Sequence, residues 1–484
     1  MPTTLNLTTP GVYIQEIPVI PSSIVSVPTA VPVFVGYTAQ AMQGTKPLTG
    51  LPYQIESMLD YVTYFGNALP EPAITVLIDT TVTPANVTAT VDETQRSKYL
   101  MYYAVQQYFD NGGGVCYILS IAPYGPNLIS ESDYLDKLSN LFCPVLEQYN
   151  DITLVVCPDA MGLPTAQSYY SLQSAVLAHC IKLQNRMAVM DLYRTPGNTW
   201  QQDVSFLRSG QNGNSVFPGL TVPVEPEDFK FGAVYFPRIK TTQQFNLDYT
   251  KINVTYNPSS TAATTMDKLK ASNSQLYYQA DNYIKNSLEM LMPAAPGMVG
   301  IYAAVDDSFG VWKAPANVSM ADVVDLEVQV SAFDQGTYLN VDPVAGLSIN
   351  AIRSFPGRGP AIVWGARTLA GNDNEWRYIP VRRFFFMVEQ SIKNAIEPFV
   401  FEPNDNNTWT RVSAMITTYL TELWKAGALM GTTTKDAFVV QVGLGVTMTS
   451  QDVLEGRMIV VVQLAAVRPA EFIILQFEQM MPVS

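Results

Sequence analysis

Strands and helices alternate along residues 33–192. Short apolar segments with strand character, such as Val33–Val35 and Met187–Leu192, are separated by helical patterns such as Ser97–Asp110 and Thr165–Gln184. Repeated strand–helix units of this length favour a largely parallel sheet with helices on both faces. The sequence therefore predicts an α/β sheet domain in the first half of the chain.

The pattern changes in the second half of the chain. Residues 195–290 contain polar loops rich in Asn, Gln and Thr around short apolar segments, which predicts a variable insertion. Farther on, Arg383–Glu397 has the pattern of a helix, and Arg411–Lys425 places its apolar residues at the i, i+3, i+4 spacing of an amphipathic helix. Strand patterns follow, so we expect a C-terminal α+β domain. These patterns are Phe438–Val442, Met458–Leu464 and Glu471–Phe477.

Both ends of the chain carry strand patterns that form open edges. Val12–Ile17 alternates between prolines, which confine such a strand to an edge or a peripheral arm. Glu471–Phe477 is expected to pair with Met458–Leu464 across Arg468–Ala470. Open edges promote aggregation unless a protein uses them, as strand addition between identical molecules does. Because head-to-tail contacts that do not close generate filaments, extended β-arms at both termini predict a self-assembling structural protein.

The overall charge argues against nucleic acid as a partner. The chain has 28 basic and 42 acidic side chains, a formal net charge of −14, and such a surface repels phosphate backbones. Its four cysteines show no CxxC spacing and are expected to be buried in a chain folded in a reducing compartment. The first residues do not resemble a signal peptide, and the apolar runs are too short to span a bilayer. We therefore expect a soluble protein that folds in the cytoplasm, without membrane insertion.

Several motifs resemble functional sites but are better explained as structural elements. Asn111–Gly114 lacks the Lys-Ser/Thr of a phosphate loop and follows a helix, as a C-cap does. Phe355–Pro360 is typical of a turn rather than an anion cradle, and Asp306–Asp307 is typical of a solvated turn. His179, the single histidine, is next to Cys180 in an apolar helix, where adjacent side chains point about 100° apart. The sequence therefore predicts no catalytic residue, no cofactor, no metal site and no enzymatic activity.

Six segments of the chain carry a resemblance to one known family. They are Thr9–Glu16, Gly310–Asn317, Trp364–Leu369, Trp376–Arg383, Phe401–Asn404 and Gly456–Gln479. Together they resemble the contractile tail sheath proteins of phage tails and related injection particles. The first is similar to the opening motif of that family, the last is similar to its closing strands, and all six occur in the order in which the family has them.

The resemblance implies a structural role. Sheath subunits stack as hexameric rings around an inner tube, between a baseplate and a terminator or cap, and contract to drive the tube through a target envelope. The resemblance also implies that the N-terminal arm and the C-terminal strands of neighbouring subunits interlock in a shared sheet. This strand exchange carries over to Val12, Ile14 and Glu16 on one side, and to Ile459, Val461, Phe472 and Ile474 on the other.

The resemblance also suggests which residues contact the inner tube and to which kind of particle the chain belongs. Arg411 and Lys425, on the polar side of the 411–425 helix, are candidates for tube contact, and a solvated helix face explains them equally well. Both arms are present in one chain, whereas type VI secretion sheaths divide the subunit between two chains. A phage tail or an extracellular contractile injection particle, with subunits folded in the bacterial cytoplasm, therefore fits better.

A nucleotide- or metabolite-binding α/β enzyme is the alternative, because residues 33–192 resemble a doubly wound fold and fold alone does not give function.

The expected division of the chain is an N-terminal strand-exchange arm, an α/β outer domain, a variable insertion, the remainder of the outer domain with a connection, an inner tube-facing α+β domain and a C-terminal strand-exchange arm. In that order, these regions are 1–22, 23–194, 195–290, 291–370, 371–455 and 456–484.

Overall fold

A computed structural model of the chain describes residues 24–93, 95–125, 129, 131–138, 142–209, 226–257, 263–340 and 346–475. Two compact units are distinguished. The large unit comprises Val27–Gln390 and Ala466–Ser484, and the small unit comprises Met1–Ser26 and Ser391–Ala465. Among the described residues, the chain passes from the small unit to the large unit after Ser26, returns to the small unit at Ser391 and enters the large unit again at Ala466.

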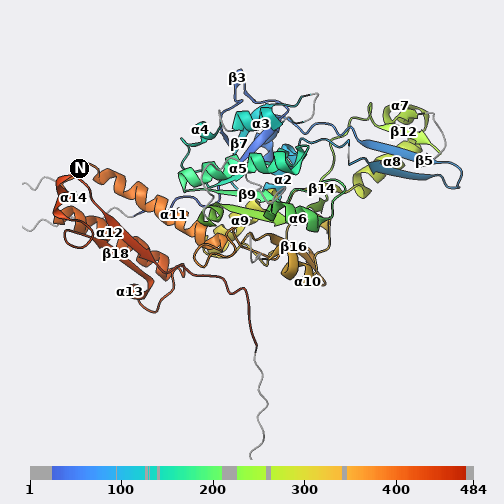
Figure 1. Cartoon of the computed structure of the whole chain (residues 1–484). Helices are drawn as coiled ribbons and strands as arrows, with labels where there is room; N and C mark the ends of the chain where they lie inside the picture. Colours follow the sequence, from blue (N-terminus) through green and yellow to red (C-terminus); the bar gives the residue numbers. More distant parts are fainter. Residues whose placement is uncertain are drawn as a thin grey trace, which may run out of the picture. The chain divides into compact units, whose positions relative to one another are not determined.

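An eight-stranded sheet forms the centre of the large unit (Figure 1). Its strand order is β17-β16-β10-β9-β8-β1-β7-β4, and neighbours from β16 to β7 are parallel. β17 and β4 pair antiparallel at the two edges. All seven residues of β1 are buried, as expected of a parallel sheet covered on both faces. The strands are β1 (Pro32–Thr38), β4 (Tyr53–Ile55), β7 (Cys116–Pro123), β8 (Leu154–Val156), β9 (Met187–Asp191), β10 (Gly232–Phe236), β16 (Asn350–Phe355) and β17 (Gly359–Val363).

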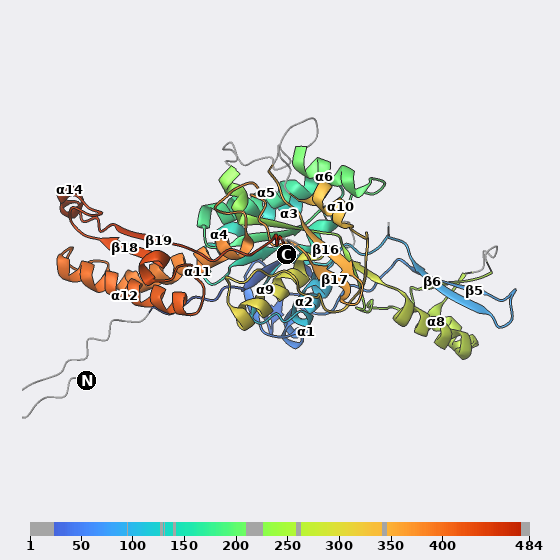
Figure 2. The ribbon, with the colours of Figure 1, turned by 90° about the horizontal axis from the view of Figure 1, so that it is seen from below.

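Helices cover both faces of this sheet, with α3 and α5 on one side and α1, α2 and α9 on the other (Figure 2). The mixed α/β fold and the parallel sheet predicted from the sequence are thus confirmed. The helices of this part are α1 (Met58–Phe65), α2 (Met101–Asp110), α3 (Glu131–Lys137), α4 (Cys143–Leu146), α5 (Ala166–Leu183), α6 (Trp200–Ser209), α9 (Ala295–Phe309) and α10 (Ala332–Asp334).

Three smaller sheets also belong to the large unit, with strand orders β13-β12-β5-β6, β14-β11-β15 and β2-β3. The four-stranded sheet is accompanied by α7 and α8. The polar region 195–290 supplies β12 to this sheet and β10 to the eight-stranded sheet, so part of it is integral to the core. The elements are β2 (Met42–Gln43), β3 (Lys46–Pro47), β5 (Ile74–Asp79), β6 (Asn86–Val91), β11 (Ile239–Thr241), β12 (Asn253–Tyr256), β13 (Ala263–Thr265), β14 (Met290–Met292), β15 (Val323–Leu326), α7 (Met266–Ser272) and α8 (Ser274–Ser287).

The small unit is built around the amphipathic helix α12 (Asn406–Lys425). The Asp405 side chain caps this helix by accepting hydrogen bonds from two backbone N–H groups, so the helix begins five residues before the predicted start. Its buried apolar stripe is the predicted one except for Trp424, which is half-buried: Val412, Met415, Ile416, Tyr419, Leu420 and Leu423. The other elements are α13 (Thr434–Ala437), β18 (Phe438–Val442), α14 (Ser450–Leu454) and β19 (Val460–Leu464), and α11 (Ile379–Ile396) enters this unit from the large one.

A buried aspartate joins the end of strand β8 to the beginning of helix α2. Asp159 accepts hydrogen bonds from the backbone N–H groups of Leu100 (2.5 Å) and Met101 (3.0 Å), and from that of Tyr37 in β1 (2.7 Å). The first N–H groups of a helix have no partner within the helix, so this carboxylate satisfies them. Burial raises the pKa of Asp159 to about 7, although the three N–H donors act in the opposite direction.

A second aspartate repeats this arrangement at the neighbouring strand. Asp191, the last residue of β9, accepts hydrogen bonds from the N–H groups of Ala294 (2.7 Å) and Ala295 (3.1 Å), where α9 begins. Burial also raises its pKa to about 7. Parallel strands and the helices that cover them are therefore joined by side chains as well as by apolar packing.

Two predictions from the sequence are wrong. Asp306–Asp307 lies in the last turns of α9, and the Asp306 side chain is buried against a distant arginine that no local pattern reveals. Within the described residues, 471–475 form no strand and do not pair with β19. β19 pairs instead with β18, and their apolar residues Phe438 and Leu464, Val440 and Val462, and Val442 and Val460 lie opposite each other. Residues after β19 are less suited to a ladder, because Pro469 has no N–H to donate.

Asp159 is expected to make the stability of the fold depend on pH. Because its pKa is higher in the folded chain than in the unfolded chain, protonation favours folding. The free energy of unfolding should therefore fall as pH rises from about 4 to about 7, and Asp159→Asn should remove that part of the slope. Urea unfolding at a series of pH values measures it, with the exposed Asp307→Asn as the control. Equal slopes for the wild-type chain and Asp159→Asn would contradict the prediction.

Candidate assembly surfaces

The ribbon formed by β18 and β19 has an open outer edge on each strand, as far as the described residues go. Its register pairs Phe438 with Leu464 and Val442 with Val460. A ribbon of two strands is only marginally stable alone, and its outer N–H and C=O groups can pair with a further strand. The two edges are therefore places where another strand can be added.

One hydrogen bond shows which backbone groups point outward. The N–H of Ala465 donates to the carbonyl of Ala437 across the ribbon, over 2.9 Å. Hydrogen-bonded and non-hydrogen-bonded pairs alternate along antiparallel strands. The N–H groups of Val440 and Val462 therefore point away from the partner strand, toward the open edges.

The two faces of the ribbon differ in exposure. Phe438 is buried, and the side chains of Val440 and Val462 share its face. Val461 lies opposite Gln441 on the other, more exposed face, and alternation places Ile459 there as well. Two of the residues predicted to exchange strands therefore lie on one face of the ribbon.

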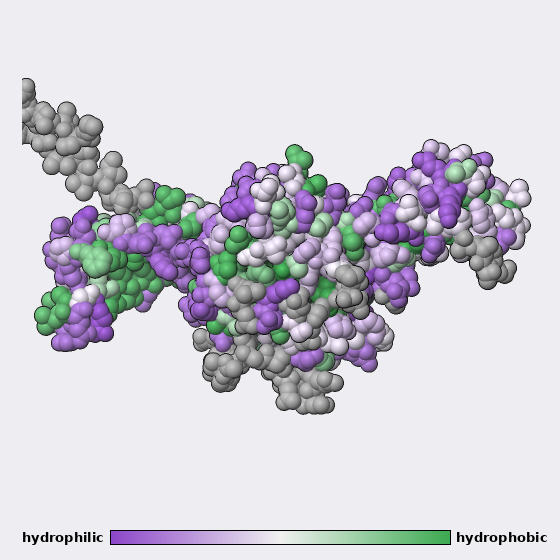
Figure 3. All heavy atoms as spheres, turned by 90° about the horizontal axis from the view of Figure 1, so that it is seen from above, coloured by the Kyte–Doolittle hydropathy of each residue, from purple (hydrophilic) through white to green (hydrophobic). Residues whose placement is uncertain are grey.

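Exposed apolar side chains gather on the small unit (left in Figure 3). Phe401 is fully exposed, at 102%, and its φ of 73° lies in the left-handed region that non-glycine residues rarely adopt. Exposed apolar patches on a folded unit mark interaction surfaces. The other large apolar side chains that are exposed in the described part of this unit are Val25, Val400, Met430, Val439, Leu444, Val446, Leu454 and Ile459.

The chain returns from β19 to the large unit as an extended segment, Ala466–Leu475, which we call the C-terminal arm. Its last four residues are apolar and unusually exposed, from 72% for Phe472 to 83% for Ile474. Four consecutive exposed apolar side chains are unfavourable in water, so this arm is a second candidate assembly surface.

The C-terminal arm is attached to the large unit at Glu471. The Arg367 guanidinium donates to both carboxylate oxygens, from Nε over 3.0 Å and from Nη2 over 2.5 Å. The hydroxyl of Tyr378 donates to the same carboxylate over 3.1 Å, and burial together with Glu471 raises the pKa of Tyr378, which keeps it a donor. Nearby, Arg468 donates to the backbone carbonyl of Asn374 over 2.7 Å. The arm therefore leaves the large unit from a defined point.

A pocket of about 630 Å³ opens beside this attachment point. Aromatic side chains form much of its wall, and residues 467–471 of the arm close one side. Four of the segments that carry the sheath resemblance contribute to its lining. The aromatic lining residues are Phe309, Trp312, Trp364 and Tyr378.

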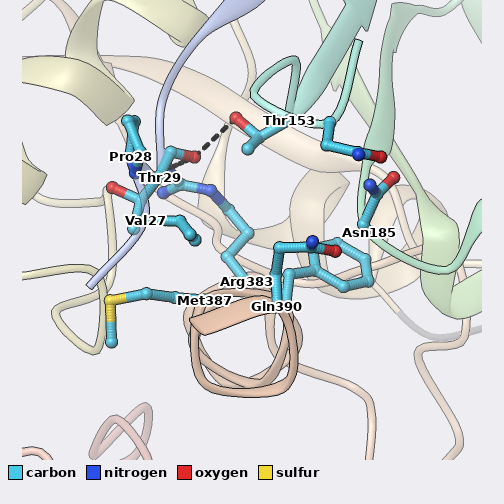
Figure 4. Close-up of a pocket in the computed structure, with 10 residues that line it drawn as sticks. Val27, Pro28, Thr29, Thr153, Asn185, Arg383, Met387 and Gln390 are labelled. Carbon is cyan, nitrogen blue, oxygen red and sulfur yellow. Dashed lines mark hydrogen bonds between the residues drawn. The ribbon is translucent and has the colours of Figure 1, made fainter. Parts of the chain in front are cut away.

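The first residues of the large unit, Val27–Thr29, are attached to it through a buried ion pair between Arg383 and Asp306. Figure 4 shows Thr29 between Arg383 and Thr153. Arg383 of α11 binds both carboxylate oxygens of Asp306, over 3.0 and 2.5 Å, and donates to the carbonyl of Thr29 over 3.1 Å. The hydroxyl of Thr29 donates to Asp306, and the hydroxyl of Thr153 donates to the carbonyl of Thr29 over 2.7 Å. The side chains of Arg383 and Asp306 are only 2% and 7% exposed. The first residues of the large unit are therefore fixed by charged and polar contacts.

The two cations considered for tube contact lie on the exposed side of α12. Arg411 is half exposed, with Nη1 3.9 Å from Glu402 and its guanidinium 5.1 Å from the centre of the Phe399 ring. Lys425 is exposed in the last turn of the same helix. Their exposure is compatible both with tube contact and with a solvated helix face.

The crevice in which a doubly wound enzyme binds its ligand is filled by the chain itself. Ligands in such folds bind at the carboxyl ends of the strands where the strand order reverses, often with a phosphate at a helix N-terminus. In this sheet the strand order reverses at β1, which lies between β7 and β8. The carboxylate of Asp159 lies at the end of β1 and accepts hydrogen bonds from the N-terminus of α2. A Cβ atom at Gly36 would lie only 2.4 Å from Asp159 Oδ2. The structure therefore does not favour a nucleotide site there.

The single histidine and its neighbour are structural. Burial and the nearby Arg186 lower the pKa of His179 to about 4, and burial raises the pKa of Cys180 to about 12. His179 Nε2 lies 3.2 Å from Arg186 Nη1 within the core. Among the described residues, no group of three metal-binding side chains comes together, and no helix combines the length and apolar character needed to cross a membrane.

Sequence reasoning did not identify the attachment points, and the strand-exchange role of the two termini stays a prediction. Val12, Ile14 and Glu16 lie outside the described residues. Arg367, Tyr378 and Arg383 fall within segments that carry the resemblance, although nothing in the pattern indicated which carboxylates they bind.

Comparisons with known proteins agree with this architecture. Residues 371–480 match the family model of the phage tail sheath C-terminal domain. A chain of the PVC sheath complex, from an extracellular contractile injection system in its contracted state, is 30% identical, with 98% of this chain and 99% of that chain covered and a TM-score of 0.62. A chain of the helical sheath of the anti-feeding prophage, also contracted, is 29% identical, with 98% and 99% covered and a TM-score of 0.61.

A chain in the six-fold symmetrised baseplate structure of the anti-feeding prophage is likewise 29% identical, with 98% and 100% covered and a TM-score of 0.61. A comparison with curated protein sequences finds no match. The fold and the similarities define a structural component of a contractile, phage tail-like assembly. The chain belongs to the family of contractile tail sheath proteins.

The buried ion pair at the N-terminal attachment should be essential for the stability of the large unit. Removing one partner of such a pair costs about 3–5 kcal/mol because the other charge stays buried without compensation. We expect this loss in the free energy of unfolding for Asp306→Ala, and a loss of less than about 0.5 kcal/mol for the exposed neighbour Asp307→Ala. The apolar double variant Asp306→Leu, Arg383→Met should recover part of the loss. Urea unfolding measures all three, and similar losses for the two alanine variants would contradict the prediction.

Proposed function

We propose that this chain is the subunit that polymerises as stacked hexameric rings around an inner tube, and that the resulting sheath contracts to drive the tube through a target envelope. The similarity to chains of contracted sheath structures supports this role, and the six-fold symmetry stated for one baseplate relative agrees with hexameric rings. The subunit would fold in the bacterial cytoplasm and become part of an extracellular injection particle or a phage tail.

The open ribbon edges are the observation that carries the proposal. They belong to the same chain as an N-terminal segment with a strand pattern and an apolar C-terminal arm. In the proposed exchange, Val12, Ile14 and Glu16 of one molecule add to the ribbon of another, which carries Ile459 and Val461. Phe472 and Ile474 of a further molecule complete the shared sheet. Backbone hydrogen bonds would supply affinity, and alternating side chains would set the register.

The proposed partners follow from this arrangement. Residues 371–455 would face the inner tube, with Arg411 and Lys425 as the candidate contacts, whereas residues 23–194 would form the outer part of the sheath. The ends of the polymer would meet a baseplate and a terminator or cap. The filled crevice at Asp159 supports a role that needs no nucleotide.

Contraction would draw on energy stored in the lattice. An extended sheath that is kinetically trapped can bury further surface when its rings rotate and approach. If each subunit gains about 1–3 kcal/mol, a lattice of about a hundred subunits releases a few hundred kcal/mol. Exchanged strands would keep neighbouring subunits attached while their large units move.

Negative-stain microscopy of the purified chain tests the proposal, with hollow tubes as the expected result. Deletion of residues 1–20 should abolish tubes while circular dichroism shows each subunit still folded. A monomer that does not change with protein concentration and that binds a small ligand would contradict the proposal and favour the enzyme alternative.

Backbone-specific variants test strand addition at the open edges. Val440→Pro and Val462→Pro each remove an outward N–H but no ladder hydrogen bond, so at least one should block tube formation. Val440→Ala and Val462→Ala are the matched controls, because alanine keeps the N–H, and both should form tubes. Normal tube yield from both proline variants would show that these edges do not accept a strand.

A further inference from the structure

We propose that Arg367, Tyr378 and Glu471 form a clamp that takes up tension on the C-terminal arm before this tension reaches the ribbon. The inference rests on the proposed function, in which the arm links one subunit to another. It assigns these three residues a mechanical role, as positioning residues that protect the strand-exchange sheet while rings move.

The order of the chain places the clamp between the load and the ribbon. β19 ends at Leu464, the clamp holds Glu471, and the exposed apolar residues Phe472–Leu475 follow. A pull on those apolar residues therefore reaches Glu471 first. It reaches Leu464 only if the clamp opens and the weaker contact of Arg468 with the Asn374 carbonyl also breaks.

The ribbon is poorly suited to carry that pull alone. Leu464 pairs with Phe438 at the end of the ladder, and the Ala465–Ala437 hydrogen bond lies just beyond it, so a load entering there acts on these terminal contacts first. A two-stranded ribbon is marginally stable on its own, and pairs lost from one end leave the remaining ladder shorter. Opening of this ribbon would also destroy the edges to which neighbouring strands are proposed to add.

The clamp has the geometry of a strong attachment. Arg367 grips the carboxylate with two nitrogen atoms, and its side chain is 8% exposed while that of Glu471 is 28% exposed. Two-point Arg–carboxylate contacts combine energy with a fixed geometry, and partial burial limits screening by salt. Tyr378 adds a third hydrogen bond to the same carboxylate.

The protein side of the clamp is connected to the central sheet. The side chain of Asn350, a buried residue of β16, accepts a hydrogen bond from the N–H of Arg367 over 2.7 Å and donates to its carbonyl over 2.8 Å. Arg367 and Tyr378 also form a backbone bridge with each other. Force on Glu471 would therefore pass into the eight-stranded sheet, whose strands contribute to the buried core of the large unit.

Glu471→Gln is the sharpest variant, because it keeps the shape of the side chain and removes its charge. The matched control is Glu455→Gln, which changes a surface ion pair with Arg457 in the small unit. A spin label on Ala470→Cys reports the mobility of the arm, in a Cys143→Ser background because Cys143 is only half-buried. Loss of charge-assisted hydrogen bonds should enlarge the released population of the arm roughly tenfold. Glu455→Gln should leave the mobility of the spin label at the wild-type value, and Glu471→Gln should leave the melting temperature of the chain unchanged.

The mechanical part is tested on assembled tubes. Glu471→Gln tubes should break into shorter pieces than wild-type tubes after the same hydrodynamic shear, whereas Glu455→Gln tubes should keep the wild-type length distribution. Unchanged arm mobility, or equal lengths for Glu471→Gln and wild-type tubes, would overturn the inference. If the wild-type chain forms no tubes, the proposed function fails, and the spin-label experiment still decides whether the clamp holds the arm.

Discussion

Backbone N–H and C=O groups at the open edge of a strand bind water or a further strand, and the small unit does not complete its own sheet in the part of the chain that the structure describes. The α12 helix packs against β18 of the β18–β19 ribbon, and the ribbon's two outer edges are open in the described part of the chain. The C-terminal arm has the complementary problem, because its apolar residues have no surface to cover them. A polymer in which one molecule supplies what another lacks satisfies both requirements.

The large unit provides rigid attachment for the segments that make these connections. Its parallel sheet is buried on both faces, and Asp159 and Asp191 join strand ends to helix beginnings. The carboxylate of Asp159 occupies the place where a doubly wound enzyme fold would bind an anion, so the chain itself fills that crevice. Arg383 holds Thr29 near the start of the large unit, and Arg367 holds Glu471 in the C-terminal arm. Both ends of the large unit are therefore held at defined points.

The sequence predicted the elements whose signal is local. Helix α5 begins after Thr165 and ends at Gln184 as expected, because the cap and the apolar spacing are both contained in the segment. The parallel sheet followed from the alternation of strands and helices. The resemblance identified the family from short segments, among them Thr9–Glu16, which lies outside the described residues.

Features that depend on distant partners escaped sequence reasoning. Asp306 was expected in a solvated turn because its partner, Arg383, lies 77 residues away. Glu471 was expected in a strand because the residues that follow it have strand character, although an arginine 104 residues earlier holds it. The pairing of β19 with β18 was missed because 17 residues, 443–459, separate the two strands, and no short turn signal connects them. In each case a long-range contact decided the outcome, and no local pattern encodes such a contact.

The most direct test of the account is a high-resolution cryo-EM map of the assembled tube in which residues 12–16 can be traced. The account predicts that these residues lie on an open edge of a β18–β19 ribbon that belongs to another molecule. A map in which residues 12–16 pair only with strands of their own chain would contradict it.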